Sequence, residues 1–330
     1  MQCRVEPTSF ELVAREWDDI FTRCAEPSVF DSLVWQRSWW EHFGAGSELR
    51  LSKVTSSDGN IRLIAAFSKS GSKISFLGGT DLVDYHGFLS DGGAVGVEVA
   101  AVVVSLCAEQ ACTTIELLSL PEASPAVELV PEILRQKKWH VEVEREDVAP
   151  RLTLPTTWEA YLEVLSKKDR HELRRKMRRL ESAGAVQDVE LKSPDDVASQ
   201  FDSFLSLHRK STPEKAEFMT ATREQFFRSV SRSLAEAGMT RLRFLELDGK
   251  KVATSLSFVV GGVRYLYNSG YDPEFREFSV GLMNHAYGIK ASIEEGIRVF
   301  DFMRGNEPYK YSLGATDRVL YRIKAERPAG

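Results

Sequence analysis

Few residues in this chain can ligate a metal or build a disulfide framework. The sequence contains no CxxC pair, and none of its histidines and cysteines form a cluster with the spacing of zinc ligands. We therefore expect reduced, mostly buried thiols and no metal site. The chain has only four cysteines: Cys3, Cys24, Cys107 and Cys112.

Long apolar runs are also absent. No run approaches the roughly 20 residues that span a bilayer, and Met1 to Phe10 lack the cationic start and apolar core of a secretory signal. No low-complexity tail or long linker is visible either. These absences argue against a transmembrane protein and lead us to expect a cytoplasmic one.

What remains is the composition of a globular protein. The 330 residues are 43% apolar and 28% charged, which suits two ordinary domains. The net charge is −5, yet residues 166–181 carry eight Lys or Arg against three Asp or Glu, a local charge of +5. An acidic chain with one concentrated basic helix is an asymmetry that requires a physical explanation.

Apolar periodicity and turn residues predict an α/β organisation in the first half. The turn Ser57-Asp58-Gly59-Asn60 joins two strands as a hairpin. We expect helices at 10–24, 32–43, about 95–110 and about 125–137, and strands at 49–55, 61–67, 73–77, 113–118 and 139–145.

The second half repeats this order. From Asp58-Gly59 to Gly71, and from Asp248-Gly249 to Gly261, the spacing is the same 13 residues. The similarity predicts a duplicated α/β unit, with boundaries at 1–150 and 151–330, although two unrelated β-meanders can give the same pattern. The expected strands are 241–247, 251–260, 263–269 and 298–303, and the helix that follows the third strand is 281–295.

More helices are expected between the two copies. The basic segment forms one of them, with a buried stripe that includes Leu173 and Leu180. The polar stretch Ser211 to Phe218 contains Pro213 and is interpreted as a loop that can act as a lid. The four helices cover 157–165, 167–183, 195–210 and 222–237.

Polar side chains gather in the segment Asp301 to Lys310, directly after a short apolar strand. Gly305 and Pro308 prevent a continuing helix, so these side chains sit on a loop at the strand's C-terminal end. Open α/β sheets bind ligands at that end. The pattern indicates the rim of an active site, with Arg304, Glu307, Tyr309 and Lys310 as its polar groups.

Several segments form an ensemble that can be compared with known families. They are Leu165 to Arg170, Leu173 to Arg175, Arg178 to Glu181, Phe204 to Arg209, Gly249 to Ala253, Tyr267 to Phe275, Ser279 to Leu282 and Asp301 to Lys310. Together they resemble the GNAT superfamily of N-acyltransferases, and within it the CelD-like, FemAB-related group with two GNAT-like units in tandem. The match runs over about residues 155–312 and is loose in the N-terminal half.

The resemblance implies two mixed, mostly antiparallel sheets flanked by helices, with a divergent first unit that does not bind the donor. It also implies transfer of an acyl group, most simply acetyl, from acyl-CoA to an amine of a small molecule or an envelope or polysaccharide precursor. Acyl-CoA is then a co-substrate, and no tightly bound cofactor is expected. In the peptidoglycan branch of the family the donor is an aminoacyl-tRNA.

One departure concerns the donor. Conventional members carry a Gln/Arg-x-x-Gly-x-Gly/Ala loop around the CoA pyrophosphate, whereas the junction from Tyr271 to Leu282 holds only Ser279-Val280-Gly281. Ser279 can still cap the following helix and leave N–H groups for a phosphate. A plain capped helix is the alternative. The expected donor-binding residues are Ser279, Val280, Gly281 and Leu282.

The polar loop supplies the candidate catalytic groups. Glu307 is the candidate general base, or the group that orients an amine, and Tyr309 can donate a proton to the leaving group. Arg304 and Lys310 suit a phosphate or carboxylate. A surface salt bridge between Glu307 and either cation is the competing interpretation.

Three more residues are candidate substrate contacts. Asp272 is otherwise a turn residue, and His208 is otherwise a core histidine. Arg174 belongs to the basic helix, whose charged face is either solvated, or contacts a polyphosphate, or contacts tRNA or an anionic membrane. No aromatic residue interleaves the arginines, which disfavours recognition of single-stranded nucleic acid by stacking.

Three functions stay open on the sequence alone. The first is an acyl-CoA-dependent N-acyltransferase with an amine acceptor. The second keeps the fold and uses an aminoacyl-tRNA, which the basic helix and the missing loop favour. The third is a non-catalytic scaffold on a degenerate transferase fold.

Overall fold

The chain folds into two compact units. The computed structural model describes residues 3–93 and 95–328. Unit 1 takes in the chain up to Val148 and again from Arg318, and unit 2 is Ala149–Asp317. The expected division at residue 150 lies two residues away from this boundary. The expectation that 151–330 is one domain was wrong at its end, because the last strand belongs to the sheet of unit 1.

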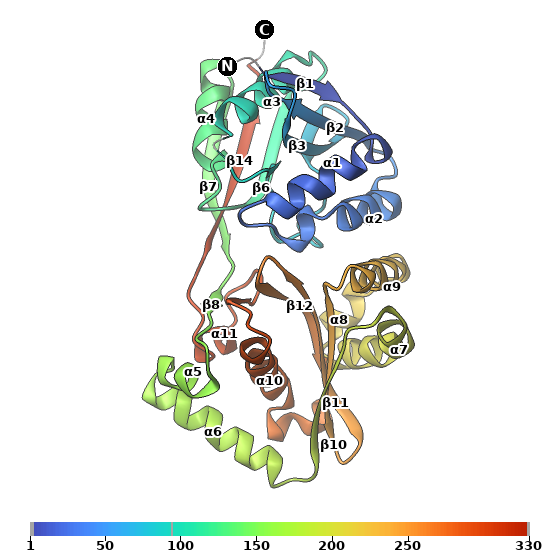
Figure 1. Cartoon of the computed structure of the whole chain (residues 1–330), viewed down its shortest axis with the longest axis vertical. Coiled ribbons are helices and arrows are strands. Elements are labelled where there is room, and N and C mark those ends of the chain that lie inside the picture. The colour runs from blue at the N-terminus through green and yellow to red at the C-terminus, as the bar shows by residue number, and fades with distance from the viewer. Residues whose placement is uncertain (1–2, 94, 329–330) are drawn as a thin grey trace. The chain divides into compact units, whose positions relative to one another are not determined.

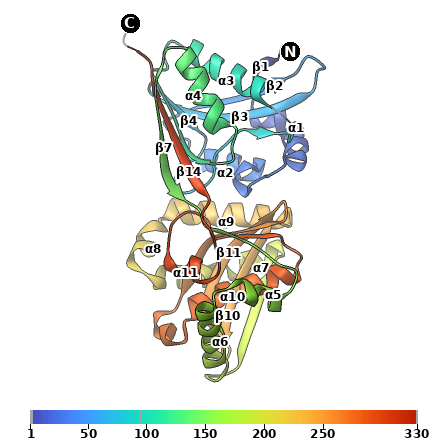
Figure 2. The ribbon, with the colours of Figure 1, turned by 90° about the vertical axis from the view of Figure 1, so that its left-hand side faces the viewer.

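Unit 1 is a sheet with helices on both faces (Figure 1). Its strand order is β1-β2-β3-β4-β6-β14-β7, and β5 pairs with β3. Figure 2 shows β14 beside β7. The strands are β1 (Arg4–Pro7), β2 (Glu48–Thr55), β3 (Ile61–Ser70), β4 (Lys73–Phe76), β5 (Leu89–Ser90), β6 (Thr114–Pro121), β7 (His140–Val148) and β14 (Val319–Glu326). The helices are α1 (Phe10–Arg23), η1 (Val29–Asp31), α2 (Leu33–Phe43), α3 (Gly96–Ala108) and α4 (Ala126–Gln136).

Strand β3 explains why both faces of this sheet are covered. Side chains alternate between the faces along a strand. Leu63, Ala65 and Phe67 pack with residues of α3 and α4. Ile64, between them, packs with residues of α1. A strand that is apolar on both faces requires a helical layer on each side.

Unit 2 has the order β8-β13-β12-β11-β10-β9. Its strands are β8 (Arg151–Thr153), β9 (Val186–Leu191), β10 (Thr240–Leu247), β11 (Lys250–Val260), β12 (Val263–Tyr271) and β13 (Val299–Asp301). Its helices are α5 (Trp158–Val164), α6 (Lys167–Glu181), α7 (Pro194–Ser211), α8 (Pro213–Phe218), α9 (Ala221–Glu236), η2 (Pro273–Phe278), α10 (Val280–Glu294) and α11 (Pro308–Ser312).

The helices of unit 2 form one layer on each side of its sheet (Figure 1). On one side, Leu245 of β10 shares a core cluster with Leu180 of α6 and Ile289 of α10. On the other, the Tyr267 ring lies 5.6 Å from Phe227 of α9, measured between centroids. Helix α7 packs against α9 on that second side. The sheet therefore separates α10 from α7.

The two units repeat one topology. Strands β1-β2-β3-β4-β6-β14 of unit 1 correspond in order to β9-β10-β11-β12-β13-β8 of unit 2. In each unit one pair is parallel, β4 with β6 and β12 with β13, and the neighbouring pairs are antiparallel. The predicted fold of two mixed, mostly antiparallel sheets is confirmed.

Several details differ from the sequence prediction, which did not contain strands β1, β5, β8, β9 and β14. Residues Pro213–Phe218 are helix α8 rather than a loop, because Thr212 accepts a hydrogen bond from the Lys215 N–H and proline suits the first helical position. The strand expected at 298–303 ends at Asp301. Its early end opens the candidate site.

Candidate functional site

Strands β12 and β13 separate within unit 2. They pair in parallel only from Val263 to Tyr265, although β12 continues to Tyr271. A bulge at Tyr267, where Leu256 pairs with Asn268 and Ser257 with Leu266, bends β12 at this point. The edge of β12 beyond Tyr265 therefore has no strand beside it among the residues that the structure describes.

Helices α7 and α8 approach this free edge. The Tyr271 N–H donates to Ser211 Oγ at 2.9 Å, and Lys215 Nζ donates to the Ser269 carbonyl. Gly270 permits the approach, since a Cβ there would lie 2.5 Å from the His208 Cα. The main-chain groups of β12 are thus satisfied partly by side chains of α7 and α8, in place of a neighbouring strand.

The loop after β13 is held by a buried lysine. Met303 and Gly305 have φ of 63° and 106°, and the Asp301 carboxylate accepts the Met303 N–H at 2.8 Å. Lys310 Nζ donates to the carbonyls of Met303, Arg304 and Gly305 at 2.9, 2.8 and 2.9 Å. These bonds use its three N–H donors, and Lys310 is only 2% exposed. The expectation that Lys310 binds the phosphate or carboxylate of a ligand was wrong, because the loop's own carbonyls and Glu307 already use this ammonium.

Glu307 is the carboxylate of this loop that reaches solvent. Its Oε2 lies 2.9 Å from Lys310 Nζ, and its side chain is 55% exposed. Arg304 is half-buried on the same turn. The structure brings Glu307 and Lys310 into one ion pair, yet leaves the other side of the carboxylate open to a substrate.

Two neutral histidines lie near the site, one on each side of the sheet. His285 of α10 stacks on the Tyr309 ring at 5.2 Å, and burial, with the charges of Lys215 and Lys310, lowers its pKa to about 3. His208 of α7 faces the Asn268 carboxamide at 3.1 Å, and burial lowers its pKa to about 4. Burial also raises the pKa of Tyr309. At neutral pH the site therefore holds two uncharged imidazoles and a protonated phenol.

These histidines predict an acid-sensitive fold. Below the ordinary histidine pKa of about 6.5, these histidines are protonated in the unfolded chain but stay neutral in the folded one. The free energy of unfolding therefore falls as the pH drops from about 6.5 toward the lower pKa values of the folded chain. The slope is at most about 1.4 kcal/mol per pH unit for each histidine. Urea unfolding between about pH 7 and about pH 5.5 measures the loss. The His208→Gln/His285→Gln variant should lose less stability over this interval, and the exposed His140→Gln control should behave as wild type. Equal slopes in wild type and double variant would contradict the prediction.

The start of α10 was expected to be capped by Ser279, which was wrong. Ser279 is left-handed, with φ 55°, and among the described residues its side chain makes no capping hydrogen bond. The first hydrogen bond of the helix runs from the Met283 N–H to the Ser279 carbonyl at 3.0 Å. The N–H groups of Val280, Gly281 and Leu282 precede it and lack intrahelical acceptors. A helix start of this kind can accept an anion.

The basic helix α6 lies alongside this helix start. Arg179 forms an ion pair with Glu277 at 3.2 Å, and its guanidinium lies 5.8 Å from the centre of the Phe278 ring. Glu277 and Phe278 come directly before Ser279. Arg174 and Arg178, one turn apart, are exposed on α6. The basic helix therefore packs beside η2 and the start of α10.

Asp272 is not open to a substrate. It is 2% exposed and accepts the Glu274 N–H at 3.1 Å. Lys210 and Lys250 lie 2.9 and 3.3 Å from its carboxylate. The predicted role in substrate binding was wrong, because the carboxylate caps η2 and neutralises two lysines.

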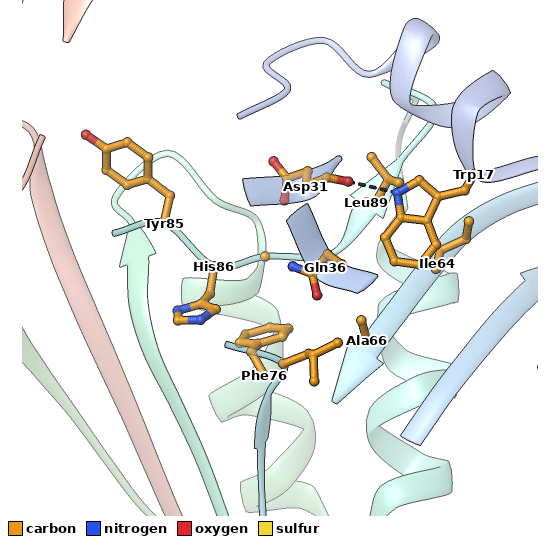
Figure 3. A pocket seen from close by; sticks show the side chains of 11 residues that line it. Trp17, Asp31, Gln36, Ile64, Ala66, Phe76, Tyr85, His86 and Leu89 are labelled. Carbon is orange, nitrogen blue, oxygen red and sulfur yellow. Dashed lines mark hydrogen bonds between the residues drawn. The ribbon is translucent and has the colours of Figure 1, made fainter. Parts of the chain in front are cut away.

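The corresponding place in unit 1 is filled. At the end of β4, the Phe76 and His86 rings stack at 5.8 Å (Figure 3). Trp17 donates its indole N–H to the Asp31 carbonyl at 2.8 Å nearby. Gln36 also lines the cavity that remains, which measures about 20 Å³. That is room for little more than a water molecule.

The described part of the chain holds no group of three or more His, Cys, Asp or Glu that could bind a metal. Within the same residues, no helix is both long and apolar enough to cross a membrane.

Sequence reasoning missed Lys215 and Ser211, which lie in or beside the supposed lid. A lysine in the first turn of a short helix carries no sequence signal, since its importance depends on the distant Ser269.

Comparisons with known proteins bear on this geometry. Residues 167–311 match the family described as Acetyltransferase (GNAT) domain. No curated protein matches the chain significantly. The structure of FemX is similar with a TM-score of 0.66 at 11% identity, over 97% of each chain. A tandem GNAT protein from the clavulanic acid biosynthesis pathway is similar with a TM-score of 0.52 at 14% identity, over 100% of each chain. The C-terminal domain of a putative lysylphosphatidylglycerol synthetase from Agrobacterium fabrum has a TM-score of 0.61 at 10% identity, over 95% of this chain and 90% of that one.

Proposed function

Because the chain belongs to the GNAT superfamily through the acetyltransferase domain at residues 167–311, we propose that it transfers an acyl group from acyl-CoA to an amine. The observation that carries this proposal is the separation of β12 from β13 after Tyr265, beside the start of α10. At one end of the gap, main-chain groups of β12 can form hydrogen bonds with the tail of the thioester. The neighbouring helix start offers N–H groups to its phosphates.

The donor is held by backbone and charge. The N–H groups of Val280, Gly281 and Leu282 bind the pyrophosphate, since a helix start combines free donors with a partial positive charge. Gly281 lets the phosphate come close. Arg174 and Arg178 of α6 add positive charge beside them. This arrangement replaces the loop that conventional members carry.

The chemistry requires little beyond alignment and one base. Holding two reactants in line contributes roughly 7–11 kcal/mol. Glu307 accepts the proton that the attacking amine releases, because its carboxylate reaches solvent at the rim of the gap. Tyr309 and His285 stay uncharged, and their stacked rings line the site without adding charge. Arg304, on the same turn, attracts an acidic part of the acceptor.

Unit 1 does not bind the donor in this proposal. Phe76 and His86 occupy the place that the gap takes in unit 2. The acceptor is an amine on a small molecule or an envelope precursor.

A matched pair of variants tests the donor site. Asp and Asn both tolerate the left-handed conformation of Ser279. Ser279→Asp should weaken acetyl-CoA binding at least about tenfold, since its carboxylate repels phosphate while stabilising the helix start by about 0.3–1 kcal/mol. Ser279→Asn should bind within about threefold of wild type, a change below about 1 kcal/mol. Calorimetry gives both affinities, and thermal melting should place the Asp variant at or above wild type.

Two outcomes would overturn the proposal. Wild-type protein that gives no heat with acetyl-CoA or longer acyl-CoAs has no donor site of this kind. Equal affinity of the Asp and Asn variants would mean that the phosphates bind elsewhere.

A second candidate donor is an aminoacyl-tRNA, which the exposed arginines of α6 favour. Phosphate contacts to a polynucleotide weaken steeply with salt. Titration with bulk tRNA at low and high salt, next to acetyl-CoA, separates the two donors. Binding of tRNA with a steep salt dependence and no binding of acetyl-CoA selects the second.

A further inference from the structure

Lys215 extends from α8 to the free edge of β12. Its backbone is fixed at the helix start, where its N–H donates to Thr212 Oγ1 at 3.3 Å. Its side chain is partly buried, and Nζ donates to the Ser269 carbonyl. Ser269 lies on the part of β12 that β13 no longer accompanies. The ammonium therefore sits in the gap assigned above to the thioester.

The Lys215 ammonium interacts electrostatically with groups on both sides of the sheet. Its positive charge contributes to the lowered pKa of His208 on α7 and of His285 on α10. These helices lie on opposite sides of the sheet (Figure 1). This interaction agrees with the position of Lys215 Nζ at the free edge of β12, beside the Ser269 carbonyl. Glu307 is the nearby carboxylate, and its charge opposes the lowering of the Lys215 pKa that burial causes.

Lys215 differs from the other buried ammonium of the site. Lys310 uses its three N–H donors on loop carbonyls. For Lys215 Nζ, the Ser269 carbonyl is the hydrogen-bond acceptor found within residues 3–93 and 95–328. An ammonium has three N–H donors, so two remain for a ligand. Lys310 therefore has a structural role, whereas Lys215 keeps N–H donors that can bind a ligand.

We propose that Lys215 is a catalytic residue, whose ammonium donates a hydrogen bond to the carbonyl oxygen of the acyl donor and stabilises the oxyanion that forms there. This inference rests on the proposed function. A preorganised donor in a partly buried site is effective because it needs no reorientation as charge develops. Lys310 cannot stabilise the oxyanion in this way, because its N–H donors are already used by the loop carbonyls.

The step balances without another reactant. The nitrogen lone pair of the amine forms a bond to the thioester carbon, and the electrons of the C=O bond move to oxygen, facing Lys215. Glu307 takes the proton that the nitrogen releases. The C–S bond then breaks, the carbonyl re-forms, and the thiolate takes the proton from Glu307. Lys215 keeps its own protons throughout.

Isotope-edited infrared spectroscopy tests the contact without an acceptor. The full chain binds acetyl-CoA labelled with carbon-13 at the thioester carbonyl. In wild type the carbonyl band should lie at a lower frequency than in free acetyl-CoA, because a hydrogen bond from a cation weakens the C=O bond. Lys215→Met should return the band to the free frequency, and Lys215→Arg, which keeps the charge, should retain part of the shift.

Each outcome decides a separate claim. A wild-type band at the free frequency, or an equal shift in wild type and Lys215→Met, overturns the role of Lys215. The first of these readings needs no variant, so the proposal stays testable even if Lys215→Met fails to fold. Absence of acetyl-CoA binding to wild type overturns the proposed function, and this inference with it.

Discussion

Glu307→Gln should lower acyl transfer by about 10²–10⁴-fold and leave acetyl-CoA affinity unchanged. Glutamine keeps the shape of the side chain and cannot accept the amine proton. The protein should stay folded, because Lys310 retains three carbonyl acceptors. Thiol release from acetyl-CoA in the presence of glucosamine, lysine or putrescine measures the rate, and calorimetry measures the affinity.

Glu217→Gln is the matched control. Glu217 is an exposed carboxylate on α8, and its variant should keep the wild-type rate. If Glu307→Gln also keeps that rate, Glu307 is only the partner of Lys310 and another group acts as base. If wild type binds acetyl-CoA and transfers nothing to any amine, the scaffold interpretation gains support.

Glu190→Gln should destabilise unit 2 by about 3–5 kcal/mol, the usual cost of leaving buried charges unpaired. Glu190 of β9 lies 3.0 Å from the Arg264 guanidinium and 2.5 Å from that of Arg243. These two arginine side chains are 1% and 3% exposed. The amide of glutamine would leave both cations short of countercharge inside the fold.

Urea unfolding followed by circular dichroism measures this loss. Glu236→Gln is the control, since Glu236 pairs with Arg232 at 3.8 Å on the surface, where both side chains are more than half exposed. Such a pair contributes about 0–1 kcal/mol. Equal midpoints for the two variants would show that the remaining carboxylates, Glu295 at Arg264 and Asp188 at Arg243, suffice as countercharges.

Local sequence patterns predict much of the fold. The Asp58-Gly59 and Asp248-Gly249 turns fix two hairpins, which the structure has as β2–β3 and β10–β11. The helix predicted at 281–295 is α10, displaced by one residue. These elements depend on turn chemistry and apolar period, which act within a few residues.

The strands that the sequence did not reveal depend on distant partners. β14 has alternating burial and pairs with β6 and β7 of unit 1, more than 150 residues earlier in the chain. β8 has only three residues and is fixed by β13. No local signal specifies such pairings, because the hydrogen bonds that define them come from strands far away in the sequence.

The candidate site divides in the same way. The sequence by itself determined that a polar loop follows a short strand, that a glycine-containing helix start precedes it, and that one helix is strongly basic. Only the tertiary structure decided which side chains are available. It buries Lys310 and Asp272 among their own partners and brings Lys215 to the edge of β12. The reason is physical: a charged side chain acts on a ligand only if the fold leaves some of its donors or acceptors unused, and that depends on neighbours far away in the chain.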